Sequence, residues 1–89
     1  MFTVYVLHSV RLGKTYTGYS SNFEARLKSH NERGTKGWTV KFRPWEVLLT
    51  EEYSSKQQAM AREKYLKTGR GREFIKEKIK SKNEKEDNK

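Results

Sequence analysis

The fold is decided by two short runs near the start of the chain, TVYVL at residues 3–7 and KTYTGY at residues 14–19. Both runs are rich in β-branched and aromatic residues, which favour strands. The connection between them, SVRLG at residues 9–13, contains a glycine and predicts a β-hairpin with a loop of several residues. An isolated hairpin is not stable in water, so later segments must cover it.

The first run is apolar on both of its faces. Val4 and Val6 alternate with Tyr5 and Leu7, and this pattern predicts a central strand that is covered on each side. Whether Tyr5 and Tyr16 share a face depends on the register of the hairpin, because a slip of one residue reverses every side chain. The sequence leaves that register open.

Three helices and a strand are expected beyond the hairpin. Capping residues at 20–22 precede good helix formers and predict a helix over residues 23–31, which Arg33-Gly34 ends. Residues 35–43 have no clean periodicity, and we interpret them as a mobile basic loop. A short strand is expected over residues 46–51. Ser55 and Gln58 have the spacing of a capping box, which predicts a helix from there to about Lys67.

A closing helix is expected from Arg70 or Gly71 to Ile79. The order β-β-α-β-α-α predicts an α+β domain, with a three-stranded antiparallel sheet flanked by helices. We assign this domain to residues 1–79. Residues 80–89 contain no aromatic or branched apolar side chain and are expected to form a disordered charged tail.

The composition indicates a polyanionic partner. The 89 residues carry a formal charge of +9, of which the last ten residues contribute one unit. A folded domain this basic favours nucleic acid as the partner, with DNA as the first expectation. The alternative is that the positive charge only keeps the protein well solvated and binds no partner. The chain has no cysteine, which excludes disulfides and thiolate metal sites. No stretch is typical of a membrane span or a signal peptide, so we expect a cytoplasmic protein without membrane contact.

Three polar residues occupy helical positions that suit chemistry. Arg26 and His30 are one turn apart at the edge of their predicted helix, and Glu63 lies in line with the inward residues Ala59 and Leu66. Each has an ordinary alternative: a solvated arginine, a histidine that packs in the core, and a carboxylate that pairs with Arg26 or Arg62.

These residues together resemble the GIY-YIG endonuclease family. The resemblance rests on Tyr5, the Tyr16-Thr17-Gly18 run, Arg26, His30 and Glu63, and it covers residues 2–79. It extends to RPWE at residues 43–46 and GRGREF at residues 69–74, as in the small stand-alone bacterial members. The chain departs from the family pattern in its first motif, where Thr3 replaces a glycine, in its second, where Thr17 replaces an apolar residue, and in its closing helix, which has no asparagine where several members have a polar partner.

The resemblance implies metal-dependent hydrolysis of nucleic-acid phosphodiesters that selects structure rather than sequence. Glu63 would hold Mg²⁺, for which Mn²⁺ can substitute, and Arg26 would grip a phosphate with two hydrogen bonds. His30 would orient a tyrosine hydroxyl or the attacking water. One of Tyr5 and Tyr16 would be the general base, and we favour Tyr16, because Gly18 beside it lets the backbone approach a ligand.

Basic residues outside this set suit phosphate contacts, which give affinity without sequence choice. They are Lys14, Lys36, Lys41, Arg43, Arg62, Lys67, Arg70 and Arg72. Two other interpretations stay open: a catalytically weak or silent nucleic-acid-binding module, and a small basic protein of a ribonucleoprotein particle. The presence of all five site residues favours the enzyme, because binding alone does not require an inward carboxylate. A protein partner that supplies targeting is also left open.

Overall fold

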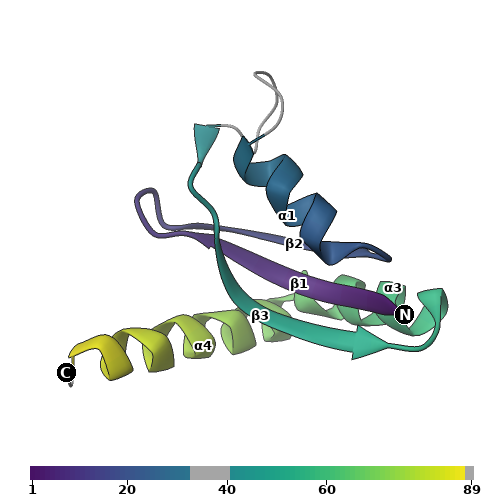
Figure 1. The fold of residues 1–89 in the computed structure, drawn as a ribbon. Helices are drawn as coiled ribbons and strands as arrows, with labels where there is room; N and C mark the ends of the chain where they lie inside the picture. The colour runs from purple at the N-terminus through teal and green to yellow at the C-terminus, as the bar shows by residue number, and fades with distance from the viewer. Residues whose placement is uncertain (33–40, 88–89) are drawn as a thin grey trace.

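The computed structural model describes residues 1–32 and 41–87. The elements follow the predicted order β-β-α-β-α-α and confirm the α+β fold (Figure 1). Their bounds are β1 Phe2–Ser9, β2 Lys14–Ser20, α1 Phe23–Glu32, β3 Glu46–Tyr53, α3 Lys56–Leu66 and α4 Gly69–Asp87. Within the described ranges, no helix is both long and apolar enough to cross a membrane.

The sheet is antiparallel, with strand order β2-β1-β3, so β1 is the central strand, as predicted. Its register with β2 places Tyr5 opposite Gly18 and Leu7 opposite Tyr16. Directly opposed residues share a face of the sheet, and so do residues two apart on one strand. Tyr5 and Tyr16 therefore lie on the same face, which is the point that the sequence left open.

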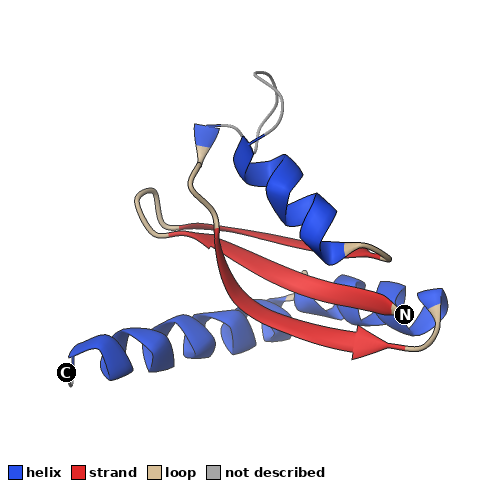
Figure 2. Cartoon of the chain, in the orientation of Figure 1, coloured by secondary structure: helices blue, strands red, loops and turns tan. Residues whose placement is uncertain are grey.

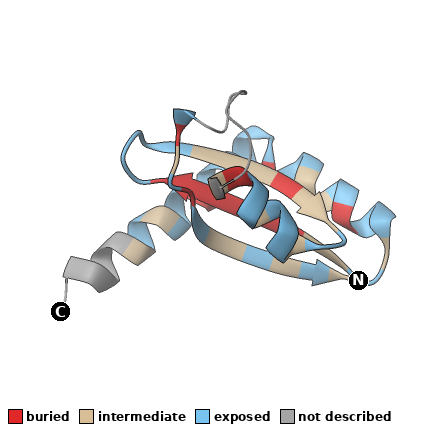
Figure 3. Cartoon of the chain, turned by 45° about the horizontal axis from the view of Figure 1, so that its top comes forward, coloured by how far each residue is buried: buried red, intermediate tan, exposed pale blue. Residues whose placement is uncertain are grey.

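Helices cover both faces of the sheet. Helix α1 lies on one side, and α3 and α4 lie on the other (Figure 2). Tyr5 and Leu7 pack on the side of α1, whereas Val4 and Val6 pack on the side of α3 and α4. All four side chains are fully buried, and Figure 3 shows the burial concentrated along β1. The alternation along one central strand thus produces two thin cores.

Both predicted helix starts are present. The Asn22 side chain accepts a hydrogen bond from the backbone N–H of Ala25 at 3.2 Å, and Ser55 accepts one from Gln58 at the same distance. The second half of the capping box is absent, because the Gln58 side chain bonds Ser54 instead. These caps satisfy backbone donors that have no partner within their helix.

The segment before β3 is anchored where the structure describes it. Residues 35–40 of the predicted mobile loop lie outside the described ranges, but Phe42 is buried and Arg43 donates to the carbonyl oxygens of Ser29 and His30 at the end of α1. Trp45 and Asn31 exchange two hydrogen bonds through the Trp45 backbone and the Asn31 amide. For residues 41–43, the expectation of a mobile loop is therefore wrong.

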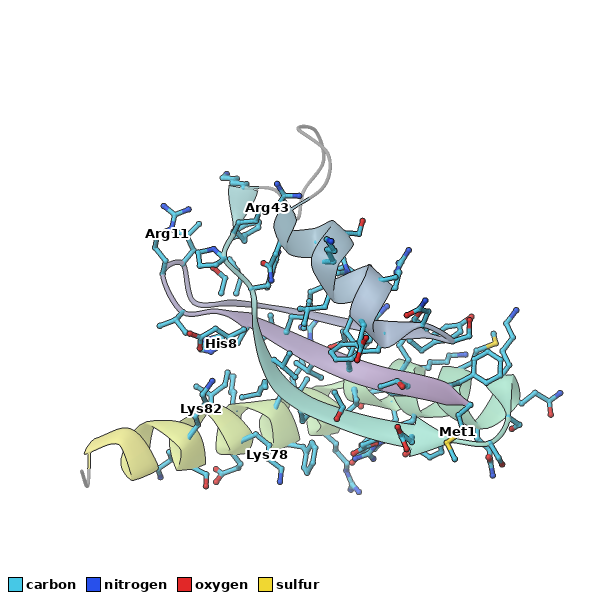
Figure 4. The ribbon with its side chains drawn as sticks, in the orientation of Figure 1. Met1, His8, Arg11, Arg43, Lys78 and Lys82 are labelled. Carbon is cyan, nitrogen blue, oxygen red and sulfur yellow. The ribbon has the colours of Figure 1, made fainter. Side chains whose placement is uncertain are left out.

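The closing helix is longer than predicted. Helix α4 continues past Ile79 to Asp87, so residues 80–87 are helical rather than disordered. Lysine and glutamate, which dominate this segment, are good helix formers even without an apolar stripe. Lys82 also forms an ion pair of 3.1 Å with Glu46 at the start of β3 (Figure 4). The prediction of disorder rested on the missing apolar side chains and did not include the helix propensity of lysine and glutamate.

Candidate active site

The centre of the candidate site is the pair of strands β1 and β2. Tyr5 has no exposed surface, whereas Tyr16 is half-buried. Between them lies Gly18, where an added Cβ would stand 2.8 Å from the Tyr5 hydroxyl oxygen and 3.2 Å from the Tyr16 ring. The first distance is too short for a real Cβ atom, and the second is tighter than most Cβ contacts. The glycine therefore provides the space in which the two tyrosines approach one another.

His30 joins the two tyrosines from α1. Its ring centroid lies 4.6 Å from that of Tyr16, and its Nε2 lies 3.4 Å from the Tyr5 hydroxyl oxygen, within hydrogen-bonding distance. The Tyr5 and Tyr16 centroids are 6.2 Å apart. The backbone of His30 is fixed by Arg43, whose Nε donates a hydrogen bond to the His30 carbonyl oxygen; Arg43 is labelled in Figure 4. This positioning role of Arg43 was not predicted, because the sequence contains no local signal for it.

Arg26 lies one turn before His30 on the same helix, on an exposed part of α1. Its guanidinium hydrogen-bonds the Tyr5 hydroxyl and also interacts with Tyr16, and these contacts raise the pKa of Arg26 above its ordinary value. The arginine is therefore charged at any working pH. One cation thus faces both phenol groups at the exposed rim of the site.

The ionisation of Tyr5 and His30 follows from burial and from this cation. Burial raises the pKa of Tyr5, and the hydrogen bond from Arg26 opposes but does not cancel that effect. Burial also lowers the pKa of His30, and the positive charges of Arg26 and Arg43 lower it further. At neutral pH, Tyr5 is therefore protonated and His30 is uncharged.

Glu63 acts on the site electrostatically, from a helix on the other face of the sheet. It lies on α3, on the other side of the sheet from α1, yet its charge acts on the Tyr5 hydroxyl and contributes to the raised pKa of Tyr5. As predicted, Ala59 and Leu66 on the same helix are buried, and the Glu63 side chain is only 21% exposed. Its carboxylate lies 3.3 Å from the Lys67 ammonium nitrogen, one turn later.

The sequence left open that Glu63 forms a structural ion pair with Arg26 or Arg62. Arg62 instead forms two hydrogen bonds with Glu51 on β3, at 2.8 and 3.1 Å. Its guanidinium also lies over the rings of Tyr65 and Phe74. Arg62 is thus occupied in packing α3 against β3, and its partner was not foreseen from the sequence.

The chain matches the model of the GIY-YIG catalytic domain over residues 1–78. It belongs to the GIY-YIG family. The UPF0213 protein SH2523 of Staphylococcus haemolyticus is 43% identical over 53 residues, which are 60% of this chain and 65% of that protein. A UPF0213 protein of Bacillus licheniformis is 41% identical over 63 residues, or 71% of this chain and 64% of that one. The matches thus span slightly under two thirds of these relatives' lengths.

A solved structure supports the assignment of this GIY-YIG domain. The solution structure of the UPF0213 protein BH0048 from Bacillus halodurans superposes with a TM-score of 0.51 at 29% identity. The match covers 84% of this chain and 82% of that one. The domain therefore shares a nuclease-like fold with small single-domain relatives.

Among the described residues, the predicted metal ligand Glu63 is not part of a cluster of metal-ligating side chains. Within residues 1–32 and 41–87, no group of three or more histidine, cysteine, aspartate or glutamate side chains could hold a metal ion. Within the described part of the chain, Glu63 is the carboxylate whose charge acts on Tyr5. This donor set fits Mg²⁺, which commonly binds through one or two carboxylates and keeps several waters or substrate phosphates as ligands.

The predicted phosphate-binding residues of the GIY-YIG domain fall into three groups. Lys14, Lys67, Arg70 and Arg72 are exposed around β2 and the turn between α3 and α4. Lys41 is exposed beside Phe42. Arg43 and Arg62 are engaged within the fold, as described above, and Lys36 lies outside the described residues.

Proposed function

We propose that this protein is an endonuclease that hydrolyses phosphodiester bonds of DNA, with a divalent metal ion, and selects the structure of its substrate rather than its sequence. The observation that supports this best is the convergence of Tyr5, Tyr16, Arg26 and His30 on one face of the sheet, where the charge of Glu63 on α3 also acts on Tyr5. Four elements contribute to this group. A module that only binds phosphate has no need of it.

Arg26 is the residue that would bind the scissile phosphate. Its charge is permanent, it is exposed, and its planar guanidinium can donate two parallel hydrogen bonds to phosphate oxygens. The same group keeps a positive charge beside the tyrosine hydroxyls. Negative charge that develops on the phosphoryl oxygens is stabilised by a donor already in place, which is the main way enzymes accelerate such reactions.

Tyr16 is the better candidate for the general base. It is the more exposed tyrosine, so water can reach it, and the Arg26 guanidinium interacts with it. Tyr5 is buried and its raised pKa keeps it protonated. We therefore assign Tyr5 a positioning role, in which its hydroxyl links His30 to Arg26.

Glu63 would hold the metal ion, together with water and the substrate phosphate. A bound Mg²⁺ neutralises charge on the phosphoryl oxygens and lowers the pKa of a coordinated water. One carboxylate gives weak affinity, so the ion and the substrate should bind together. The contact with Lys67 is no obstacle, since Lys67 is 56% exposed and exposed ion pairs are weak.

Cleavage by the full chain tests this function. Flapped, forked, nicked and single-stranded DNA and RNA are incubated with Mg²⁺ or Mn²⁺, with wild type compared with Glu63→Gln and with the control Glu52→Gln, a change at an exposed carboxylate on β3. We expect Glu63→Gln to abolish cleavage while Glu52→Gln retains it. The proposal fails if wild type cuts no faster than Glu63→Gln on every substrate.

One contact favours a second candidate, nucleic-acid binding without hydrolysis. Lys67 neutralises the Glu63 carboxylate, which leaves the site with a net positive charge that suits phosphate alone. In that case the full set of substrates would be bound but not cut.

A further inference from the structure

A basic furrow runs along the outer edge of β2, between this strand and α4. It consists of two adjoining hollows of about 330 and 370 Å³, which share Thr15, Arg72 and Ile75 as lining residues. The first hollow reaches Tyr16 of the candidate active site. The second continues away from it to Ile79 on α4. The furrow therefore adjoins Tyr16 at the edge strand, although the Tyr16 ring lies on the α1 face of the sheet, and it leads away from this residue along α4.

The lining of the furrow has one sign of charge. Its charged residues are Lys14, Lys67, Arg72 and Lys76, and neither hollow is lined by an aspartate or a glutamate. All four are exposed, and Lys67 forms the ion pair with Glu63 described above. A neighbouring hollow on α4 differs, because Glu73 and Glu77 line it together with basic residues. Charge complementarity thus selects a polyanion for the furrow and for no other hollow described here.

The wall of the furrow also offers hydrogen bonds. Among the described strands, β2 is an edge strand that pairs with β1 alone, so its outer backbone groups have no partner in this sheet. Thr15 and Thr17 add hydroxyl groups, while Ile75 and Ile79 on α4 provide apolar surface. Phosphates and sugars are the parts of a nucleic acid that such a mixed wall can contact without reading sequence.

We propose that the furrow binds the sugar–phosphate backbone of a single nucleic-acid strand that leads away from the scissile phosphate. This inference rests on the proposed function and extends it. It adds Lys76, Thr15 and Thr17 to the residues that contact the substrate, and it removes Arg43 and Arg62 from the predicted phosphate-binding residues. A single strand fits because β2 and α4 bound the furrow on both sides. A duplex would span both walls. The preferred substrate is therefore a duplex with a single-stranded extension.

The length of the furrow sets the length of that extension. Residues 13–17 span about 13 Å at about 3.3 Å per strand residue. A stacked strand advances about 3.4 Å per nucleotide, so about four nucleotides fit. Affinity should therefore rise with the length of the overhang up to about four nucleotides and then level off.

Equilibrium binding of the full chain tests this inference without any cleavage. Glu63→Gln protein, without metal, is titrated with duplexes that carry overhangs of 0, 2, 4 and 8 nucleotides, as DNA and as RNA and with either polarity. We expect a gain of at least about ten-fold between 0 and 4 nucleotides. The additional double change Arg72→Gln/Lys76→Gln should remove this gain and reduce the log–log salt slope by about 1.5, at about 0.7 to 0.9 per phosphate contact.

The control double change is Lys28→Gln/Lys56→Gln, which removes the same charge from exposed residues that do not line the furrow. It should retain the dependence on overhang length. The inference is overturned if affinity does not depend on the overhang, or if both double changes reduce the gain equally. Whichever of DNA and RNA shows the larger gain in affinity is the preferred substrate.

The two proposals can fail separately. If wild type cuts no substrate but the gain in affinity with overhang length depends on Arg72 and Lys76, the proposed function is wrong and the proposed role of the furrow is supported. If wild type cuts DNA or RNA but the overhang has no effect on affinity, the proposed function is supported and the proposed role of the furrow is wrong.

Discussion

Tyr5 and Gly18 lie opposite one another on paired strands, and a Cβ atom at position 18 would stand 2.8 Å from the Tyr5 hydroxyl oxygen. The hydroxyl that contacts His30 and Arg26 thus occupies the volume that any other residue at position 18 would need. The glycine is therefore a steric requirement of the site. It is not needed for a turn, because its backbone is ordinary strand.

Gly18→Ala should displace both tyrosines and disrupt the site. Because neither β1 nor β2 can shift without loss of pairing, we expect a loss of about 1–3 kcal/mol in the free energy of unfolding, measured by chemical denaturation. Gly69→Ala is the matched control, since nothing lies within 4 Å of its added Cβ. At the start of α4 it should leave stability unchanged or raise it by up to about 1 kcal/mol. Equal effects at the two positions would contradict the steric role of Gly18.

The two tyrosines should differ in their contribution to catalysis. Tyr16→Phe removes the hydroxyl that we assign as the base, so single-turnover cleavage should fall by about 10²–10⁴-fold with little change in binding. Tyr5→Phe removes only a positioning contact and should cost less. If Tyr5→Phe is the more damaging of the two, the assigned roles are reversed.

The elements were predictable because their signals are local. The run at residues 3–7 is apolar on both faces, and this indicated a central strand. Caps at Asn22 and Ser55 marked the starts of two helices, and the spacing of Glu63 from Ala59 and Leu66 placed it inward. Each signal involves residues within a few positions of one another.

The contacts that were not predicted depend on residues that are far apart in the sequence. The register that places Tyr5 and Tyr16 on one face is a property of two strands together. Arg62 and Glu51 lie on different elements, and their pairing depends on how α3 packs against β3. The residue type of an arginine shows that it needs a partner, but it does not show whether that partner is a phosphate or a carboxylate.

The pair of Glu51 and Arg62 should make stability depend on pH in the acid range. The hydrogen bonds from Arg62 lower the pKa of Glu51 below its ordinary value of 4.5. A lowered pKa in the folded state stabilises the protein above about pH 4.5, and this stabilisation is lost as the pH falls through the folded pKa. Glu51→Gln should therefore cost about 1 kcal/mol at pH 7 and less at pH 3, as measured by urea denaturation. Glu52→Gln, at the exposed neighbour, should cost little at either pH.

His30 should titrate at a lower pH than an ordinary histidine. Burial lowers its pKa below 6.5, and the cations Arg26 and Arg43 lower it further. The chain has two histidines, so in a His8→Gln protein the remaining Hε1 resonance reports His30 alone by NMR. We expect a midpoint below 6.5, and Arg26→Gln should move it upward because one of the two cations is removed.

The same shift has a consequence for folding. The unfolded chain binds a proton to this histidine before the folded chain does, so the free energy of unfolding should decrease as the pH falls from about 6.5 through the folded pKa. In the His8→Gln background, His30→Gln should flatten this part of the stability curve. A His30 midpoint at or above 6.5 would mean that the ring is solvated or faces a carboxylate. In that case, the ring that contacts the Tyr5 hydroxyl would not be the buried, uncharged imidazole described above.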